Sequence, residues 1–234
     1  MYRFAIAALI GLGFSSVAHA SNVFSDNFDT ENGGATALQY TGFANFNVTG
    51  GVDLVKNGDY GVMAFGNTGS AVDLSGTPGP GQLTSIASFN FNAGDQVRLS
   101  YELGGDQRGG TEDWYADFFF SGATGMLNYG FNYFGADVIA FPGLTTTTFV
   151  GTGTGISSSD PYALRSIFFT AASAGSLTFA IGTTTAGNVG PMLDNVSLDI
   201  SPVPEPSSLA LAGLGGLSLV IGAYRRRRAQ KSTI

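Results

Sequence analysis

Short stretches in which apolar and polar residues alternate recur along most of the chain. Residues 97–103 read Val-Arg-Leu-Ser-Tyr-Glu-Leu, so every second side chain is apolar. Residues 177–181 and 194–200 alternate in a similar way. A period of two is typical of a β-strand with one buried and one solvated face. The same criterion predicts further strands at residues 43–48, 60–65, 87–91, 114–120 and 167–169.

Turn-forming sequences separate these stretches. Asn57-Gly58-Asp59, Ala93-Gly94-Asp95 and Gly104-Gly105-Asp106 are examples, and no helical period lies between them. Residues 145–155 are rich in Thr and Gly and are interpreted as one more strand with a turn. Roughly ten short strands in one continuous segment favour an all-β fold, an antiparallel sandwich that covers residues 21–201 as a single extracytoplasmic domain.

Residues 1–20 have the pattern of a secretory signal peptide. Arg3 precedes a mostly apolar stretch at residues 4–17, and Ala18-His19-Ala20 is a small-x-small cleavage site. The alternative is a permanent N-terminal anchor, but the apolar stretch is short for a membrane span. We therefore expect cleavage, with a mature chain that starts at Ser21.

The C-terminal segment combines three features in a fixed order. Val203-Pro204-Glu205-Pro206 comes first, residues 207–224 follow without a charge, and a basic cluster at residues 225–231 opens with Arg225, Arg226, Arg227 and Arg228. A helix over residues 207–224 would be about 27 Å long, close to the hydrocarbon thickness of a bilayer. The pattern predicts a single C-terminal transmembrane helix whose arginines stay in the cytoplasm. A buried core helix would not end in such a cluster.

The two prolines of this segment fix an extended backbone at residues 203–206. Together, the exposed strip, the apolar span and the arginines make residues 202–230 resemble a PEP-CTERM sorting signal. The resemblance implies that an exosortase, a membrane protease, recognises Pro204-Glu205-Pro206. It also implies release of the protein towards the cell exterior, often alongside exopolysaccharide production.

Charge and composition exclude several functions for residues 21–206. This segment holds all 17 acidic residues and only Lys56, Arg98, Arg108 and Arg165 of the basic ones, so its net charge is −13. Such an acidic segment argues against nucleic-acid binding. Cysteine is absent and the single histidine is His19. Disulfides, a Ser-His-Asp triad and His-ligated zinc are therefore excluded from the mature chain.

Short motifs within residues 22–200 resemble secreted jelly-roll domains of the galactose-binding-like, carbohydrate-binding type. The most specific is Leu193-Asp194-Asn195-Val196-Ser197-Leu198, and Asp26-Asn27-Phe28 is another. The resemblance implies a jelly roll in which Ca²⁺ bridges loops near the first and last strands, with Asp194 and Asp26 as its ligands. In the alternative interpretation, Asp194 accepts hydrogen bonds from neighbouring backbone N–H groups at the start of a strand.

Acidic residues also gather around the single tryptophan. Trp114 and Tyr115 lie within a stretch that contains Glu102, Asp106, Glu112, Asp113 and Asp117. An aromatic ring beside carboxylates can stack on a sugar while the acids bind its hydroxyls, so Trp114, Tyr115 and Arg108 are predicted ligand contacts. In the alternative, Trp114 packs in the core and Arg108 pairs with one of these acids.

The sequence thus predicts a non-enzymatic, exosortase-processed protein of the cell envelope or extracellular matrix. Its sandwich would bind extracellular polysaccharide or serve structurally, and its C-terminal helix would hold it at the membrane before processing. One alternative is an extracellular glycan-active enzyme that uses paired carboxylates such as Glu102 and Asp113. Another is a surface protein that stays anchored.

Overall fold

The computed structural model describes residues 21–77, 79–121, 126–132, 148–202 and 216. The predicted signal peptide, the strip at residues 203–206 and the arginine cluster lie outside these residues, as does the predicted transmembrane helix apart from residue 216. Within the described part of the chain, no helix is both long and apolar enough to cross a membrane.

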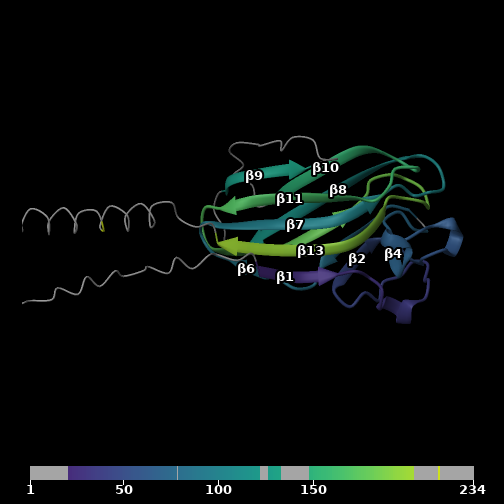
Figure 1. Cartoon of the computed structure of the whole chain (residues 1–234), viewed down its shortest axis with the longest axis horizontal. Helices are drawn as coiled ribbons and strands as arrows, with labels where there is room; N and C mark the ends of the chain where they lie inside the picture. Colours follow the sequence, from purple (N-terminus) through teal and green to yellow (C-terminus); the bar gives the residue numbers. More distant parts are fainter. Residues whose placement is uncertain (1–20, 78, 122–125, 133–147, 203–215, 217–234) are drawn as a thin grey trace, which may run out of the picture. The chain divides into compact units, whose positions relative to one another are not determined.

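The described residues between 21 and 202 form two antiparallel sheets (Figure 1). The first, sheet A, runs in the order β3 (Asp53–Lys56), β4 (Ser70–Asp73), β13 (Met192–Pro202), β7 (Asp95–Gly104), β11 (Ala163–Ala171) and β9 (Met126–Asn132), with β1 (Ser21–Asp26) paired to β13. The second, sheet B, runs in the order β10 (Thr148–Ser157), β8 (Thr111–Ser121), β12 (Gly175–Gly182), β5 (Gly81–Ser85) and β2 (Phe46–Gly50), with β6 (Phe89–Phe91) paired to β12.

The chain crosses repeatedly from one sheet to the other. β7 lies in sheet A, β8 in sheet B, β11 in sheet A, β12 in sheet B and β13 in sheet A. Neighbours within a sheet are therefore distant in sequence, as the pairing of β13 with β7 illustrates. This arrangement confirms the predicted all-β, antiparallel jelly-roll sandwich.

The core lies between the two sheets and follows from the alternation in the sequence. In β7, Val97, Leu99, Tyr101 and Leu103 are all buried, whereas the residues between them are partly exposed. Aromatic rings from both sheets meet there, such as Phe118 of β8 and Phe169 of β11, whose centroids are 5.3 Å apart. Because successive side chains of a strand point to opposite faces, the residues between the core positions lie on the outer faces of the sheets.

The prediction of a strand at residues 60–65 was wrong. This segment contains two 3₁₀ turns, η2 (Asp59–Gly61) and η3 (Phe65–Asn67), and Tyr60 has a φ of 52°. Val62 and Ala64 are nevertheless buried, in a small cluster with Val55, Ala71 and Met192. The strand neighbours of this cluster, Leu54, Val72 and Leu193, belong to the main core, so the cluster lies on the outer face of sheet A. The loop at residues 57–67 therefore covers one end of that sheet.

Candidate functional site

A groove of about 520 Å³ opens beside the loop at residues 57–67. Its apolar lining includes Met63, Phe65 and Tyr162, and the rings of Phe65 and Tyr162 pack edge to face with centroids 5.8 Å apart. Its polar lining includes Asn67, Gln107, Ser158, Ser159 and Asp160. We call this site the loop groove. It combines an aromatic pair with side-chain amides, hydroxyls and a carboxylate.

Side chains from within and beyond the loop hold the walls of the loop groove. Gln107, in the turn between β7 and β8, accepts a hydrogen bond from the Met63 N–H at 2.9 Å and donates one to the Met63 carbonyl at 2.8 Å. Asn57 accepts from the Ala64 N–H at 3.0 Å and donates to the Asn67 carbonyl at 2.8 Å. The Gln107 bonds tie the loop to the β7–β8 turn, and the Asn57 bonds connect the two halves of the loop.

Asp194 supports the same loop from β13. Its carboxylate accepts hydrogen bonds from the Asn195 N–H at 2.7 Å and from the Phe65 N–H at 3.2 Å. The side chain is almost completely buried, and this burial raises the pKa of Asp194 to about 7. The two N–H donors oppose the shift, and the negative charges of Asp29 and Glu102 add to it.

Tyr162 is the less exposed of the two aromatic side chains in the loop groove. Its ring packs over Gly104, where an added Cβ would lie 3.1 Å from the ring, so a larger residue there would require a small shift of the ring. Burial, followed by the negative charges of Asp194 and Asp73, raises the pKa of Tyr162 well above its ordinary value. The phenol therefore remains protonated at neutral pH. Its buried Oη has no hydrogen-bond partner among the described residues.

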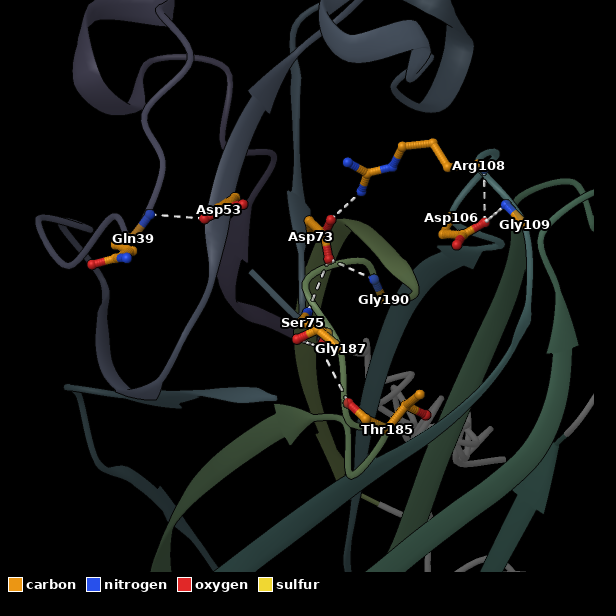
Figure 2. A network of polar contacts seen from close by, with 10 residues as sticks. All are labelled: Gln39, Asp53, Asp73, Ser75, Asp106, Arg108, Gly109, Thr185, Gly187 and Gly190. Atoms are coloured by element: carbon orange, nitrogen blue, oxygen red, sulfur yellow. Dashed lines mark hydrogen bonds and ion pairs between the residues drawn. The ribbon is translucent and has the colours of Figure 1, made fainter. Parts of the chain in front are cut away.

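A polar network centred on Asp73 joins three loops next to this site (Figure 2). Asp73 is completely buried and accepts hydrogen bonds from the N–H groups of Ser75 and Gly190, both at 2.9 Å. It also forms an ion pair with Arg108 of the β7–β8 turn. Burial raises the pKa of Asp73 to about 7, although the two N–H donors and Arg108 pull it down.

Trp114 and Tyr115 are not brought together by the fold. Trp114 is only 1% exposed, packs against Tyr101 with ring centroids 5.8 Å apart, and has the Arg165 guanidinium 5.1 Å from its ring centroid. Its ring is covered on all sides, so the position supports the packing interpretation. Tyr115 lies on the outer face of sheet B, where its Oη donates to Gln82 Oε1 at 2.9 Å. The ligand role of Tyr115 stays a prediction.

Arg108 does not pair with the acids that surround Trp114 in the sequence. Its guanidinium reaches Asp73 instead, 35 residues away (Figure 2). The sequence of residues 102–117 does not predict that Arg108 pairs with Asp73. Glu102 and Asp113 are also separated. The residues before and after Glu102 in β7 are buried in the core, and so are those before and after Asp113 in β8, so each acid points away from the core. They lie on the outer faces of different sheets and cannot flank one glycosidic bond.

The two predicted calcium ligands have separate partners. Asp26 accepts hydrogen bonds from the Phe28 N–H at 2.8 Å and from the Asn45 side chain at 2.9 Å, whereas Asp194 binds the N–H groups of Phe65 and Asn195. The described residues contain no group of three or more His, Cys, Asp or Glu side chains that could hold a metal ion. Calcium binding by these two aspartates stays a prediction.

Comparison with known proteins identifies the C-terminal segment. Residues 202–228 match the family model of the PEP-CTERM protein-sorting motif. The chain carries a PEP-CTERM sorting motif. The motif marks an exported protein with a C-terminal sorting signal and implies processing by an exosortase, as the order of Pro204-Glu205-Pro206, the apolar span and the arginines predicted.

The solved structures that resemble the chain are weak matches. The CBM22-1 xylan-binding domain of Paenibacillus barcinonensis Xyn10C is 9% identical, with a TM-score of 0.40 over 79% of this chain and 97% of that domain. The CBM22-1–GH10 modules of Clostridium thermocellum xylanase 10B are 13% identical, with a TM-score of 0.36 over 76% of this chain and 28% of that protein. No curated protein sequence matches the chain.

No pattern in the sequence indicates the loop groove itself. Phe65 and Tyr162 are far apart in the chain, and the alternation of residues 60–65 places Phe65 in a strand rather than a turn. The available signal was the glycine pattern around residues 57–67, because Gly58, Gly61 and Gly66 all adopt positive φ, which marks a turn-rich loop.

Proposed function

We propose that the exported sandwich binds glycan in the loop groove and that this protein works as a non-catalytic binding module outside the cytoplasm. The observation that carries the proposal is the pairing of Phe65 and Tyr162 within a concave site whose lining also contains amides and hydroxyls. Aromatic rings can pack on the C–H face of a sugar, and the polar rim offers hydrogen-bond partners for its hydroxyls.

The chemistry of the rim favours an uncharged, hydroxyl-rich ligand. Among the residues that the structure describes, no Lys or Arg lines the loop groove, and Asp160 is its only charged residue. Phe65 is 38% exposed, so part of this residue is accessible to a ligand.

The sorting motif indicates where the protein would meet its ligand. Export brings the sandwich to the compartment in which extracellular polysaccharide is found. The strand β13 ends at Pro202, directly before the motif, so processing within residues 203–206 leaves the sandwich and its loop groove complete.

The test is glycan-array binding of the full chain, followed by calorimetry on the best neutral oligosaccharide. Phe65→Ala removes the exposed ring and should lower affinity by about tenfold or more. Tyr115→Ala is the matched control, because it removes an aromatic ring from the outer face of sheet B. That variant should bind as the wild type does.

Three outcomes would contradict the proposal. Binding to no glycan would remove the function. Binding that is lost in Tyr115→Ala but kept in Phe65→Ala would move the site to sheet B. Release of reducing ends from a bound glycan would make the protein an enzyme rather than a binding module.

A further inference from the structure

The loop at residues 57–67 holds an exposed tyrosine in a strained backbone conformation. Tyr60 has a φ of 52°, in the left-handed region that bulky side chains rarely adopt, and it is 60% exposed. Phe28 has a similar φ of 58° but is completely buried in the core, where packing offsets the strain. The exposed Tyr60 has far less packing to offset the same strain.

The backbone on both sides of Tyr60 is held in place. Gly58 donates its N–H to the Val62 carbonyl at 2.8 Å, and the Val62 N–H donates to the Asp59 carbonyl at 2.9 Å. Val62 is completely buried, whereas Gly58 and Gly61 have φ values of 89° and 76°. The loop therefore keeps Tyr60 at the surface in its strained conformation. Such strain is concentrated at functional sites, including ligand sites.

Tyr60 lines a second concave site, of about 360 Å³, which we call the tip site. Its other lining residues are Thr36, Leu38 and Asp59. Leu38 is 51% exposed. The Thr36 hydroxyl donates a hydrogen bond to the Asp59 carboxylate and accepts one from the Lys56 N–H at 2.9 Å. The tip site thus combines an aromatic and an aliphatic side chain with a hydroxyl and a carboxylate.

The tip site and the loop groove share the loop at residues 57–67. Met63 lines the loop groove and lies three residues after Tyr60. The Cα atoms of these two residues are therefore at most about 11 Å apart. A chain of several linked sugars is long enough to extend from one residue to the other.

We propose that the tip site is a second sugar-binding subsite, so that the protein binds an extended neutral oligosaccharide across the loop. This proposal rests on the proposed binding of glycan in the loop groove. The Tyr60 ring would pack on the C–H face of one sugar, and Thr36 and Asp59 would bind its hydroxyls. The strained loop fixes Tyr60 before the ligand arrives, so less conformational freedom is lost on binding.

Calorimetry on the full chain tests the length of the ligand. The probes are neutral hexasaccharides of glucose, galactose and xylose, together with the matching disaccharides. For a sugar that the chain binds, the hexasaccharide should bind at least about tenfold more tightly than the disaccharide. Tyr60→Ala should lower affinity for the hexasaccharide by about tenfold and leave affinity for the disaccharide unchanged. Phe65→Ala should lower both affinities.

The aliphatic residue of the tip site offers a second variant with a matched control. Leu38→Ala should also weaken binding of the hexasaccharide but not of the disaccharide. Ile86 is 54% exposed, close to the value for Leu38, and lines neither site. Ile86→Ala should therefore bind both probes as the wild type does.

Thermal unfolding distinguishes a ligand role of Tyr60 from a structural one. Tyr60→Ala keeps a Cβ at the strained position and should leave the Tm within about 2 °C of the wild type, because an exposed ring contributes little packing. Tyr60→Asn should raise the Tm by roughly 2–4 °C, because asparagine adopts the left-handed region more readily. It should nevertheless lose as much hexasaccharide affinity as Tyr60→Ala does.

The proposal fails in three cases. Unchanged hexasaccharide affinity in Tyr60→Ala, with a loss in Phe65→Ala, would confine the ligand to the loop groove and leave the proposed function intact. A Tm that falls by more than about 5 °C in Tyr60→Ala would make the ring a structural part of the loop. Binding of none of these probes would overturn this proposal together with the proposed function.

Discussion

The side-chain amide of Gln107 binds both the N–H and the carbonyl of Met63, 44 residues away in the sequence. Replacing Gln107 by Glu keeps the shape and the acceptor but removes the donor. We expect the free energy of unfolding to fall by about 1 kcal/mol, because one wall of the loop groove loses a hydrogen bond. We also expect a lower affinity for ligand in the loop groove. Urea unfolding and calorimetry would measure the two effects.

Gln96→Glu is the control for this change, because Gln96 lies at the other end of β7 from the turn that holds Gln107. It should leave both quantities unchanged. Equal effects of the two substitutions would mean that added negative charge, rather than the Met63 contact, is responsible.

The ion pair between Arg108 and Asp73 is expected to matter for stability, because Asp73 is completely buried. Arg108→Met leaves a buried carboxylate without its cation and should cost about 3 kcal/mol, or roughly 6–12 °C in Tm. Adding Asp73→Asn should restore part of the loss. Arg98→Met is the control, since Arg98 rests on the Phe168 ring and bonds Ser166, and it should cost less than about 1 kcal/mol.

Stability is expected to fall as pH rises from about 4 to about 7. Burial raises the pKa of both Asp73 and Asp194 to about 7, whereas in the unfolded chain these groups titrate near 3.8. Between these values the folded chain binds protons that the unfolded chain has released, so each rise in pH favours unfolding. Each group contributes a slope of up to about 1.4 kcal/mol per pH unit.

Asp194→Asn isolates one of the two groups. Its free energy of unfolding, measured in urea from pH 5 to pH 8, should depend less steeply on pH than that of the wild type. A wild-type stability that increases from pH 5 to pH 7 would contradict the assignment of raised pKa values to these carboxyls.

Processing at the sorting motif should leave the folded domain unchanged. β13 ends at Pro202, and its last residues pair with β7 up to Asp95, so a cut at residues 203–206 removes no strand. In a host with an exosortase, intact-mass measurement should show that the exported protein lacks most residues beyond Pro206, with the same Tm as the full chain. An exported form that keeps Ile234 would support permanent anchoring instead.

The alternation of apolar residues predicted burial better than it predicted strand pairing. In β7, β12 and β13 it identified both the strand and its inward face, because these strands have partners on both sides. At residues 60–65 it correctly marked Val62 and Ala64 as buried, yet this segment is a loop. Alternation indicates which side chains are buried, but it does not indicate whether the backbone pairs with a neighbouring strand.

By itself, the sequence determined the features that depend on neighbouring residues: the period of the strands, the glycine turns, the acidic charge and the order of proline strip, apolar span and arginines. Only the tertiary structure decided which distant residues meet. It brings Arg108 into an ion pair with Asp73 and lets Gln107 hydrogen-bond to Met63. It also packs Phe65 against Tyr162 and buries Trp114 in the core. The reason is physical, because a jelly roll makes its contacts between strands that are far apart in the chain, and these contacts leave no local pattern.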